Sequence, residues 1–170
     1  MNNQEKAIKI AEELNNDNYT ELSIPILGGF TIEKTDHPNI VFIAKNKDNF
    51  MEQFLRDTKL EENEKFDTHL QHVLTETKNA MKENNIKNPE KNLLFYKTIG
   101  KYKLYIQNNI LDNIIVKQMN TYLVDSNNVF YQISIITPPM LLDPPMTIKQ
   151  DTNLNESLFE MMKTIVTNIK

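Results

Sequence analysis

The feature that most constrains the fold lies between residues 93 and 136, where four runs alternate apolar and polar side chains with a period of two. The runs are LLFYKT, YKLYIQ, NIIVKQMNTYLV and VFYQISII. Gly100 marks the first turn, NNILD is predicted to be a looser connection, and DSNN is typical of a hairpin turn. Because connections this short join antiparallel neighbours, we predict a four-stranded antiparallel meander.

Shorter elements flank this meander. Residues 22–44 contain the strand-like runs LSIPI, GFTIE and NIVFIA, separated by a Gly-Gly pair and by DHPN. Helical spacing of apolar residues predicts the remaining elements, and Asn153 with Glu156 resembles a capping box. The predicted helices cover residues 4–14, 66–84 and 154–169, together with a short segment around Phe50, Met51, Phe54 and Leu55.

The order of these elements predicts an α+β domain over residues 21–170, preceded by an amphipathic helical extension over residues 1–20. An antiparallel sheet of about six to seven strands is packed by helices, and we expect the two main helices to share one face of it. A chain of 170 residues and 19.9 kDa suits one domain with a real core.

Several runs resemble the PsbP-like superfamily of sandwich domains, which includes the Eag-type chaperones of type VI secretion effectors. LSIPILGGF resembles the family's opening strand and turn, NIVFIAK its next strand, and FDTHLQHVLTETKNAMKE its helix. LLFYKTIGKYKLYIQ is similar to the family's hairpin, and VFYQISIITPP with ESLFEMMKTIVTNI resembles the last strand and closing helix. Members are mostly adaptors and accessory subunits, so the resemblance implies binding rather than catalysis.

Composition narrows the classes of function. The net charge is −4 with no basic block, which disfavours nucleic-acid binding. There is no cysteine, so thiolate metal sites and cysteine nucleophiles are excluded. The N-terminal MNNQEKAIKIAEELNN lacks the apolar run of a secretory signal, and no stretch is long and apolar enough for stable membrane insertion. We therefore expect a cytoplasmic protein.

Candidate catalytic and metal-ligating residues are sparse. His69 and His72 lie three residues apart on a predicted helix, but no third ligand follows them, and both are expected to be exposed. The acidic cluster Glu61 to Asp67 is typical of a solvated face. We predict no catalytic residues, no metal and no cofactor.

A better signal lies on the predicted strands. One face of the meander packs on helices, and the other carries Tyr105, Phe130 and Ile136. If this second face is open, it offers an apolar surface for a helix or strand of a partner protein. The alternative is that residues 4–14 or 45–60 cover it.

The segment TPPMLLDPPM places Met140, Leu141 and Leu142 between two proline pairs. Prolines stiffen the loop, so it loses less entropy on binding. These three residues are either a docking loop for a partner or a lid that folds back on the core.

Together these patterns predict a non-catalytic adaptor or chaperone for an apolar segment of a partner protein, with a secretion-associated bacterial chaperone as the most concrete version. The partner-binding residues would be Tyr105, Phe130, Ile136 and the Met140–Leu142 loop. The alternatives are an immunity or inhibitor protein that binds a basic toxin, and a small-ligand-binding protein or enzyme. Pairing with a second copy is left open.

Overall fold

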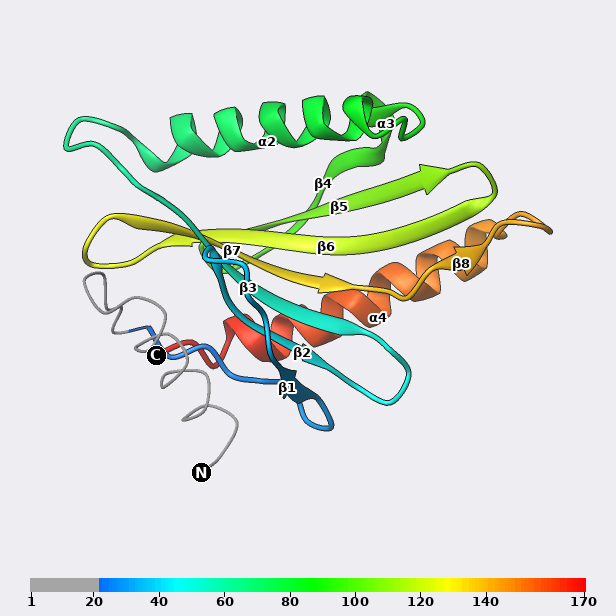
Figure 1. The fold of residues 1–170 in the computed structure, drawn as a ribbon, viewed down its shortest axis with the longest axis horizontal. Coiled ribbons are helices and arrows are strands. Elements are labelled where there is room, and N and C mark those ends of the chain that lie inside the picture. The colour runs from blue at the N-terminus through cyan, green and yellow to red at the C-terminus, as the bar shows by residue number, and fades with distance from the viewer. Residues whose placement is uncertain (1–21) are drawn as a thin grey trace.

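The computed structural model describes residues 22–170, and the helix expected at 4–14 lies outside the described residues. The described part is an antiparallel sheet with helices on both faces (Figure 1). The strands are β1 Thr31–Glu33, β2 Ile40–Lys45, β3 Met51–Lys59, β4 Leu93–Ile99, β5 Tyr102–Leu111, β6 Ile114–Val124, β7 Val129–Ile136 and β8 Met140–Leu141. The helices are α2 Phe66–Glu83, α3 Pro89–Asn92 and α4 Ile148–Val166.

The expectation of an α+β fold with an antiparallel sheet is confirmed. The strand order is β1-β2-β3-β7-β6-β5-β4, and β8 pairs with the end of β6 beyond the last residue of β7. The predicted meander forms β4 to β7, and the two-residue β8 brings the described sheet to eight strands rather than six or seven.

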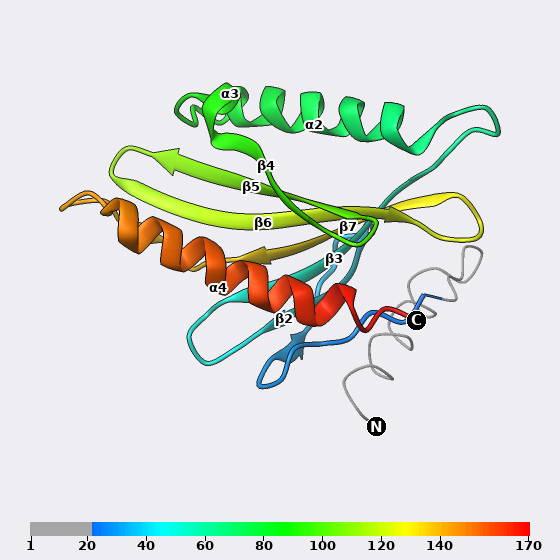
Figure 2. The same cartoon turned by 180° about the vertical axis from the view of Figure 1, so that it is seen from behind.

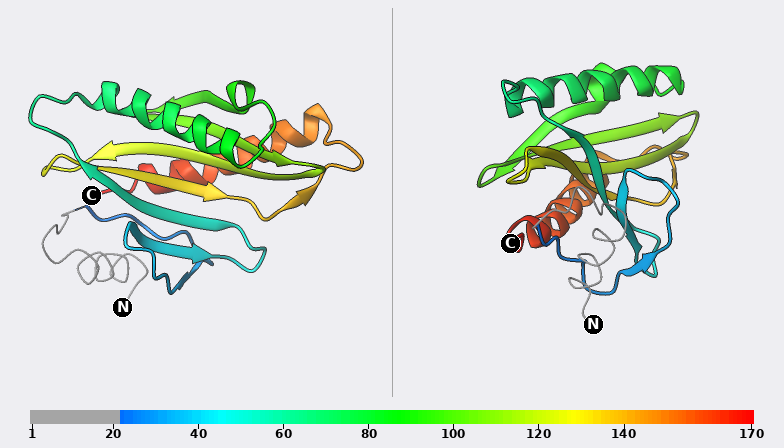
Figure 3. Two further views of the ribbon diagram at one scale, coloured as in Figure 1. Left: turned by 45° about the horizontal axis from the view of Figure 1, so that its top comes forward. Right: turned by 60° about the vertical axis from the view of Figure 1, so that its left-hand side comes forward.

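The two long helices cover opposite faces of the sheet, so the expectation that they share one face is wrong. Figure 1 shows α2 above the sheet, and Figure 2 shows α4 running across the other side. The reason is topological: β3 lies in the middle of the sheet and β4 at its edge, so the chain between them crosses over β7, β6 and β5. Helix α2 forms within this crossover (Figure 3).

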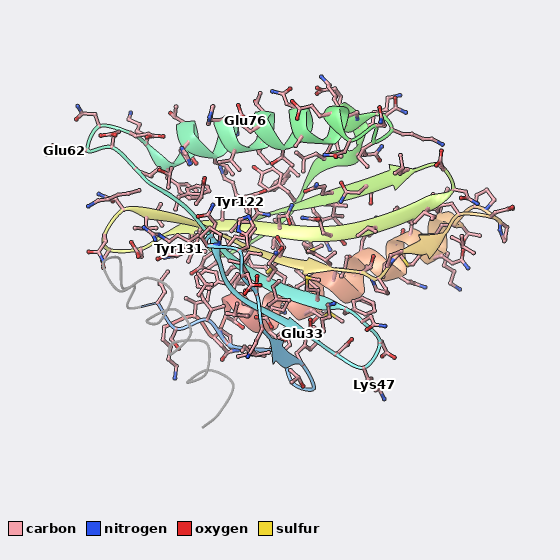
Figure 4. The ribbon with its side chains drawn as sticks, viewed as in Figure 1. Glu33, Lys47, Glu62, Glu76, Tyr122 and Tyr131 are labelled. Carbon is pink, nitrogen blue, oxygen red and sulfur yellow. The ribbon has the colours of Figure 1, made fainter. Side chains whose placement is uncertain are left out.

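Each face therefore has its own apolar core. Under α2, Leu70, Leu74 and Met81 pack with aromatic residues of the meander, including Tyr122. Under α4, Leu158, Met162 and Ile165 pack with the other side of the same strands, including Tyr131. Figure 4 labels both tyrosines, which lie in these two separate cores.

The helix predicted around Phe50, Met51, Phe54 and Leu55 is wrong, because strand β3 begins at Met51 and includes the last three of these residues. Pairs four residues apart suit a helix, but Glu52 and Phe54 are also two apart, and both are buried. The segment forms a strand rather than a helix because β2 and β7 hydrogen-bond to β3 on its two sides. A central strand pairs its backbone N–H and C=O groups on both sides, whereas a short helix leaves the N–H and C=O groups at its two ends unpaired.

Two element boundaries and one predicted strand also differ from expectation. Helix α4 begins at Ile148, where Thr147 and Gln150 form the capping box that was predicted at Asn153. Residues 108–111 of the run NNILD continue β5 instead of forming a loose connection, so the β5–β6 hairpin is long. The run LSIPI is not a strand, although its Ile24 and Ile26 are buried in the α4-side core.

Candidate functional site

Two of the predicted partner-binding residues are buried beneath α2. Phe130 is 0% exposed and Tyr105 is 8% exposed, so the expectation of an open face is wrong at these positions. The cover is α2 itself, since residues 51–59 of the alternative cover form strand β3 within the sheet. Burial raises the pKa of the Tyr105 hydroxyl, which keeps it neutral.

Beside this aromatic cluster, the same face carries a network of amide and hydroxyl side chains. Gln118 donates to Asn120 (2.8 Å), Asn120 donates to Gln107 (3.0 Å), and the Ser134 hydroxyl donates to Asn120 (2.7 Å). Asn120 and Ser134 are fully buried. Because buried polar groups are costly unless paired, this network marks where the apolar packing under α2 stops.

Beyond the polar network, the α2-side face ends in an apolar strip. Strand register puts the members on one face, because Met51 pairs with Ile136, Leu111 pairs with Ile114, and Ile114 pairs with Leu141. Leu111, Ile114 and Leu141 are 46%, 41% and 69% exposed, and the other members are half-buried. The apolar strip consists of Met51, Leu111, Ile114, Val116, Ile136 and Leu141.

The loop 137–146 forms part of this strip because β8 pairs it onto β6. Met140 pairs with Ile115, and the backbone N–H of Leu142 donates to the Asn113 carbonyl (2.6 Å). Successive residues of β8 point to opposite faces. Leu141 therefore lies exposed in the strip, while the half-buried Leu142 lines a cavity.

That cavity has a volume of about 540 Å³ and opens at the same end of the sheet as the strip. Its apolar wall includes Ile115 and Ile148, and Ile148 is 88% exposed at the start of α4. Lys117, on the α4 side of β6, is 1% exposed and pairs with Asp151 of α4 (2.9 Å). This ion pair ties the start of α4 to the sheet next to the cavity, which also has Asp151 in its lining.

A second hollow, of about 860 Å³, lies between α2 and strands β2, β3 and β7. His69 lies on its wall and is 6% exposed, so the expectation that His69 is exposed is wrong, whereas His72 is exposed. His69 packs edge-on against Phe130, and its ring nitrogens contact carboxylates of Glu64 (2.7 Å) and Asp57 (3.1 Å). The histidine thus fastens the first turns of α2 to β3.

The described residues contain no group of three or more His, Cys, Asp or Glu side chains placed to hold a metal ion. Glu52 is the most perturbed acid of the described part. It is fully buried beside the α4-side core, its Oε1 accepts from the Leu27 backbone N–H (2.8 Å), and burial raises its pKa to about 8. Since Glu52 lines neither the cavity nor the second hollow, we assign it a structural role.

Of the six predicted partner-binding residues, Ile136, Met140, Leu141 and Leu142 lie together at the end of the sheet, and Tyr105 and Phe130 do not. Sequence reasoning missed Leu111, Ile114 and Ile148. A signal for the first two existed, because they flank the Asp112–Asn113 turn of the β5–β6 hairpin, where exposed apolar residues are unusual.

Comparisons of the chain with protein-family models, curated proteins and solved structures find no match. Among the described helices, none is both long enough and apolar enough to cross a membrane.

Proposed function

We propose that this protein is a non-catalytic binding module, an adaptor or chaperone that receives an apolar segment of a partner protein on the apolar strip. The observation that carries this proposal is the row of Leu111, Ile114 and Leu141, three exposed apolar side chains on adjacent strands. Contiguous exposed apolar surface with a polar border is typical of protein interaction sites. Here the border is the network that includes Gln118 and Asn120.

Two further features support the proposal. The cavity lies on the α4 face at the same end of the sheet, so a partner that wraps around this end finds a partly apolar recess for an anchoring side chain. The buried His69 has both ring nitrogens in contact with carboxylates, which leaves neither as an evident general base. The resemblance to PsbP-like adaptors points in the same direction, and cytoplasmic, secretion-associated work in a bacterium is the most concrete form of the proposal.

The hollow beside α2 favours a second candidate, a binding protein for a small polar ligand. Its wall combines apolar side chains such as Leu55 with polar ones such as Gln53, Gln132 and Glu76, a mixture typical of ligand sites. In contrast, the inhibitor alternative rests on exposed acids such as Glu62 (Figure 4), which nothing else in the fold gathers into a site.

Two variants test whether a partner protein binds the apolar strip or the hollow beside α2. Ile114→Asp with Leu141→Asp places charges on exposed positions of the strip, and Ala80→Asp does the same on the wall of the α2 hollow. Tagged wild type and both variants are used for affinity capture from native lysate in low and high salt, with mass spectrometry of retained proteins.

We expect one dominant partner that survives high salt, is lost by the strip variant and is kept by Ala80→Asp. Loss with Ala80→Asp alone would place protein binding at the hollow instead of the strip, and retention of no specific protein would favour the small-ligand candidate. A basic partner lost at high salt would favour the inhibitor function. Circular dichroism and thermal melting of each variant show that the fold is intact.

A further inference from the structure

The two edges of the sheet differ in how they are protected. Edge strand β1 is three residues long, and its Glu33 pairs with Lys45 of β2 (3.5 Å). Edge strand β4 is seven residues long and, within the described residues, pairs only with β5. Soluble proteins normally keep an edge short, charged or covered, because its free N–H and C=O groups are a template for another strand. Strand β1 follows this rule along its whole length. Strand β4 follows it only in its second half, where the register shifts and Lys97 lies, and its first residues, 93–95, are uncharged and have no second described strand beside them.

The unprotected part of β4 is apolar on both faces. Leu94 is 49% exposed and Phe95 is 56% exposed. Phe95 lies on the α2 side, where its ring meets that of Tyr105 edge-on (5.8 Å), so its neighbour Leu94 points to the other face. Both side chains thus stand at the rim of the sheet, one above and one below the free backbone edge.

The length of the free edge is set at both ends. Helix α3 ends where β4 begins at Leu93, so the chain before it is not extended. At the other end the β4–β5 register shifts between Phe95 and Lys97, which is typical of a bulge. Lys97 is held over the α4 side by Glu156 (2.9 Å). The regular free edge is therefore centred on Leu94.

We infer that β4 pairs antiparallel with β4 of a second copy of this chain, with the two Leu94 residues beside the two-fold axis. Leu93 of each copy then lies opposite Phe95 of the other, and the apolar side chains meet across the junction on both faces. Every pairing within the described sheet is antiparallel, so the two-fold pair continues the same ladder. This inference does not depend on the proposed function.

We choose a second copy rather than a strand of another protein because the two differ in which strand edge stays unpaired. A single added strand covers β4 but exposes its own outer edge. Two-fold pairing uses both β4 edges at once and gives a closed, isologous dimer. The joined sheet would then end in the short β1 strand at both sides. Because the regular stretch is brief, the dimer should be weak and dependent on concentration.

Disulfide cross-linking tests this dimer, because the chain has no cysteine and each variant then carries a single, known one. Directly opposed residues of an antiparallel pair have Cα atoms about 4.5–5.5 Å apart, which is within reach of a disulfide. Leu94→Cys should therefore give a covalent dimer under mild oxidation. The matched control is Thr31→Cys, at an exposed position of the opposite edge strand, and it should stay monomeric.

Sedimentation of the unmodified protein should show a monomer–dimer equilibrium that persists in high salt, and Phe95→Lys should shift it to monomer without changing circular dichroism. The inference is overturned if the wild type stays monomeric at its highest soluble concentration. It is equally overturned if Phe95→Lys leaves the dimer unchanged, or if both cysteine variants cross-link to the same extent.

Discussion

Glu52 gives the protein a specific dependence of stability on pH. Its carboxyl is fully buried on β3, Oε1 accepts one backbone N–H, and Oε2 has no hydrogen-bond partner within the described part. Burial raises its pKa from 4.5 to about 8, so the folded protein holds this carboxyl protonated at neutral pH. In the unfolded chain the same carboxyl is ionised at pH 7.

The direction of the pH dependence of stability follows from the difference between the folded and unfolded pKa values of Glu52. Below pH 4.5 the group is protonated in both states and has no effect on stability. Between 4.5 and about 8 only the unfolded chain loses the proton, so stability falls as pH rises. Each pKa unit corresponds to about 1.4 kcal/mol, so we expect Glu52 to cost about 3 kcal/mol at pH 7.

Glu52→Gln tests this reasoning directly. The amide oxygen can still accept from Leu27, and the variant cannot ionise. Urea denaturation from pH 4 to pH 8 should show equal stability near pH 4 and a variant more stable by about 3 kcal/mol at pH 7. Glu62→Gln, at an exposed position, is the control and should match the wild type throughout. A difference between Glu52→Gln and wild type that does not change with pH would refute the account.

Two other substitutions test interactions near the apolar strip and the cavity at the same end of the sheet. Asp151→Ala leaves the buried Lys117 ammonium without its carboxylate, and since Asp151 is half-exposed we expect a loss of about 1–3 kcal/mol in chemical denaturation. Asn120→Ala removes the centre of the buried amide network and should cost about 2–4 kcal/mol, because Ser134 and Gln107 lose partners. A cost below about 0.5 kcal/mol for either would show that water replaces the lost contacts.

The sequence predicts the meander well because its signal is local. Strands β4 to β7 follow from alternation of side chains and from turn residues such as Gly100, which depend on neighbours in the chain. Leu141 and Leu142 also stand out locally, as apolar residues between proline pairs. Leu141 is exposed and Leu142 is half-buried because β8 pairs with β6, and the sequence of the loop does not indicate this pairing.

What could not be predicted depends on contacts far apart in the chain. Phe130 is covered because β3 pairs with β7, which forces α2 to cross the sheet, and no local pattern specifies that pairing. His69 is buried because its ring packs against Phe130 of β7, and its Nε2 contacts Asp57, twelve residues earlier on another element. The spacing of apolar residues around Phe54 fits both a helix and a strand over so short a run, and pairing with β2 and β7 determines that the segment is a strand.

The central claim is that the apolar strip contacts a partner protein, and site-specific photo-cross-linking tests it most directly. A benzophenone amino acid replaces Leu141 in the strip, and a matched protein carries it at Ala80 beside α2. After irradiation in native lysate, mass spectrometry identifies the cross-linked peptides. We expect Leu141 to cross-link to an apolar segment of one dominant partner and Ala80 to remain free of it. Cross-links to that partner from Ala80 with none from Leu141 would contradict the account.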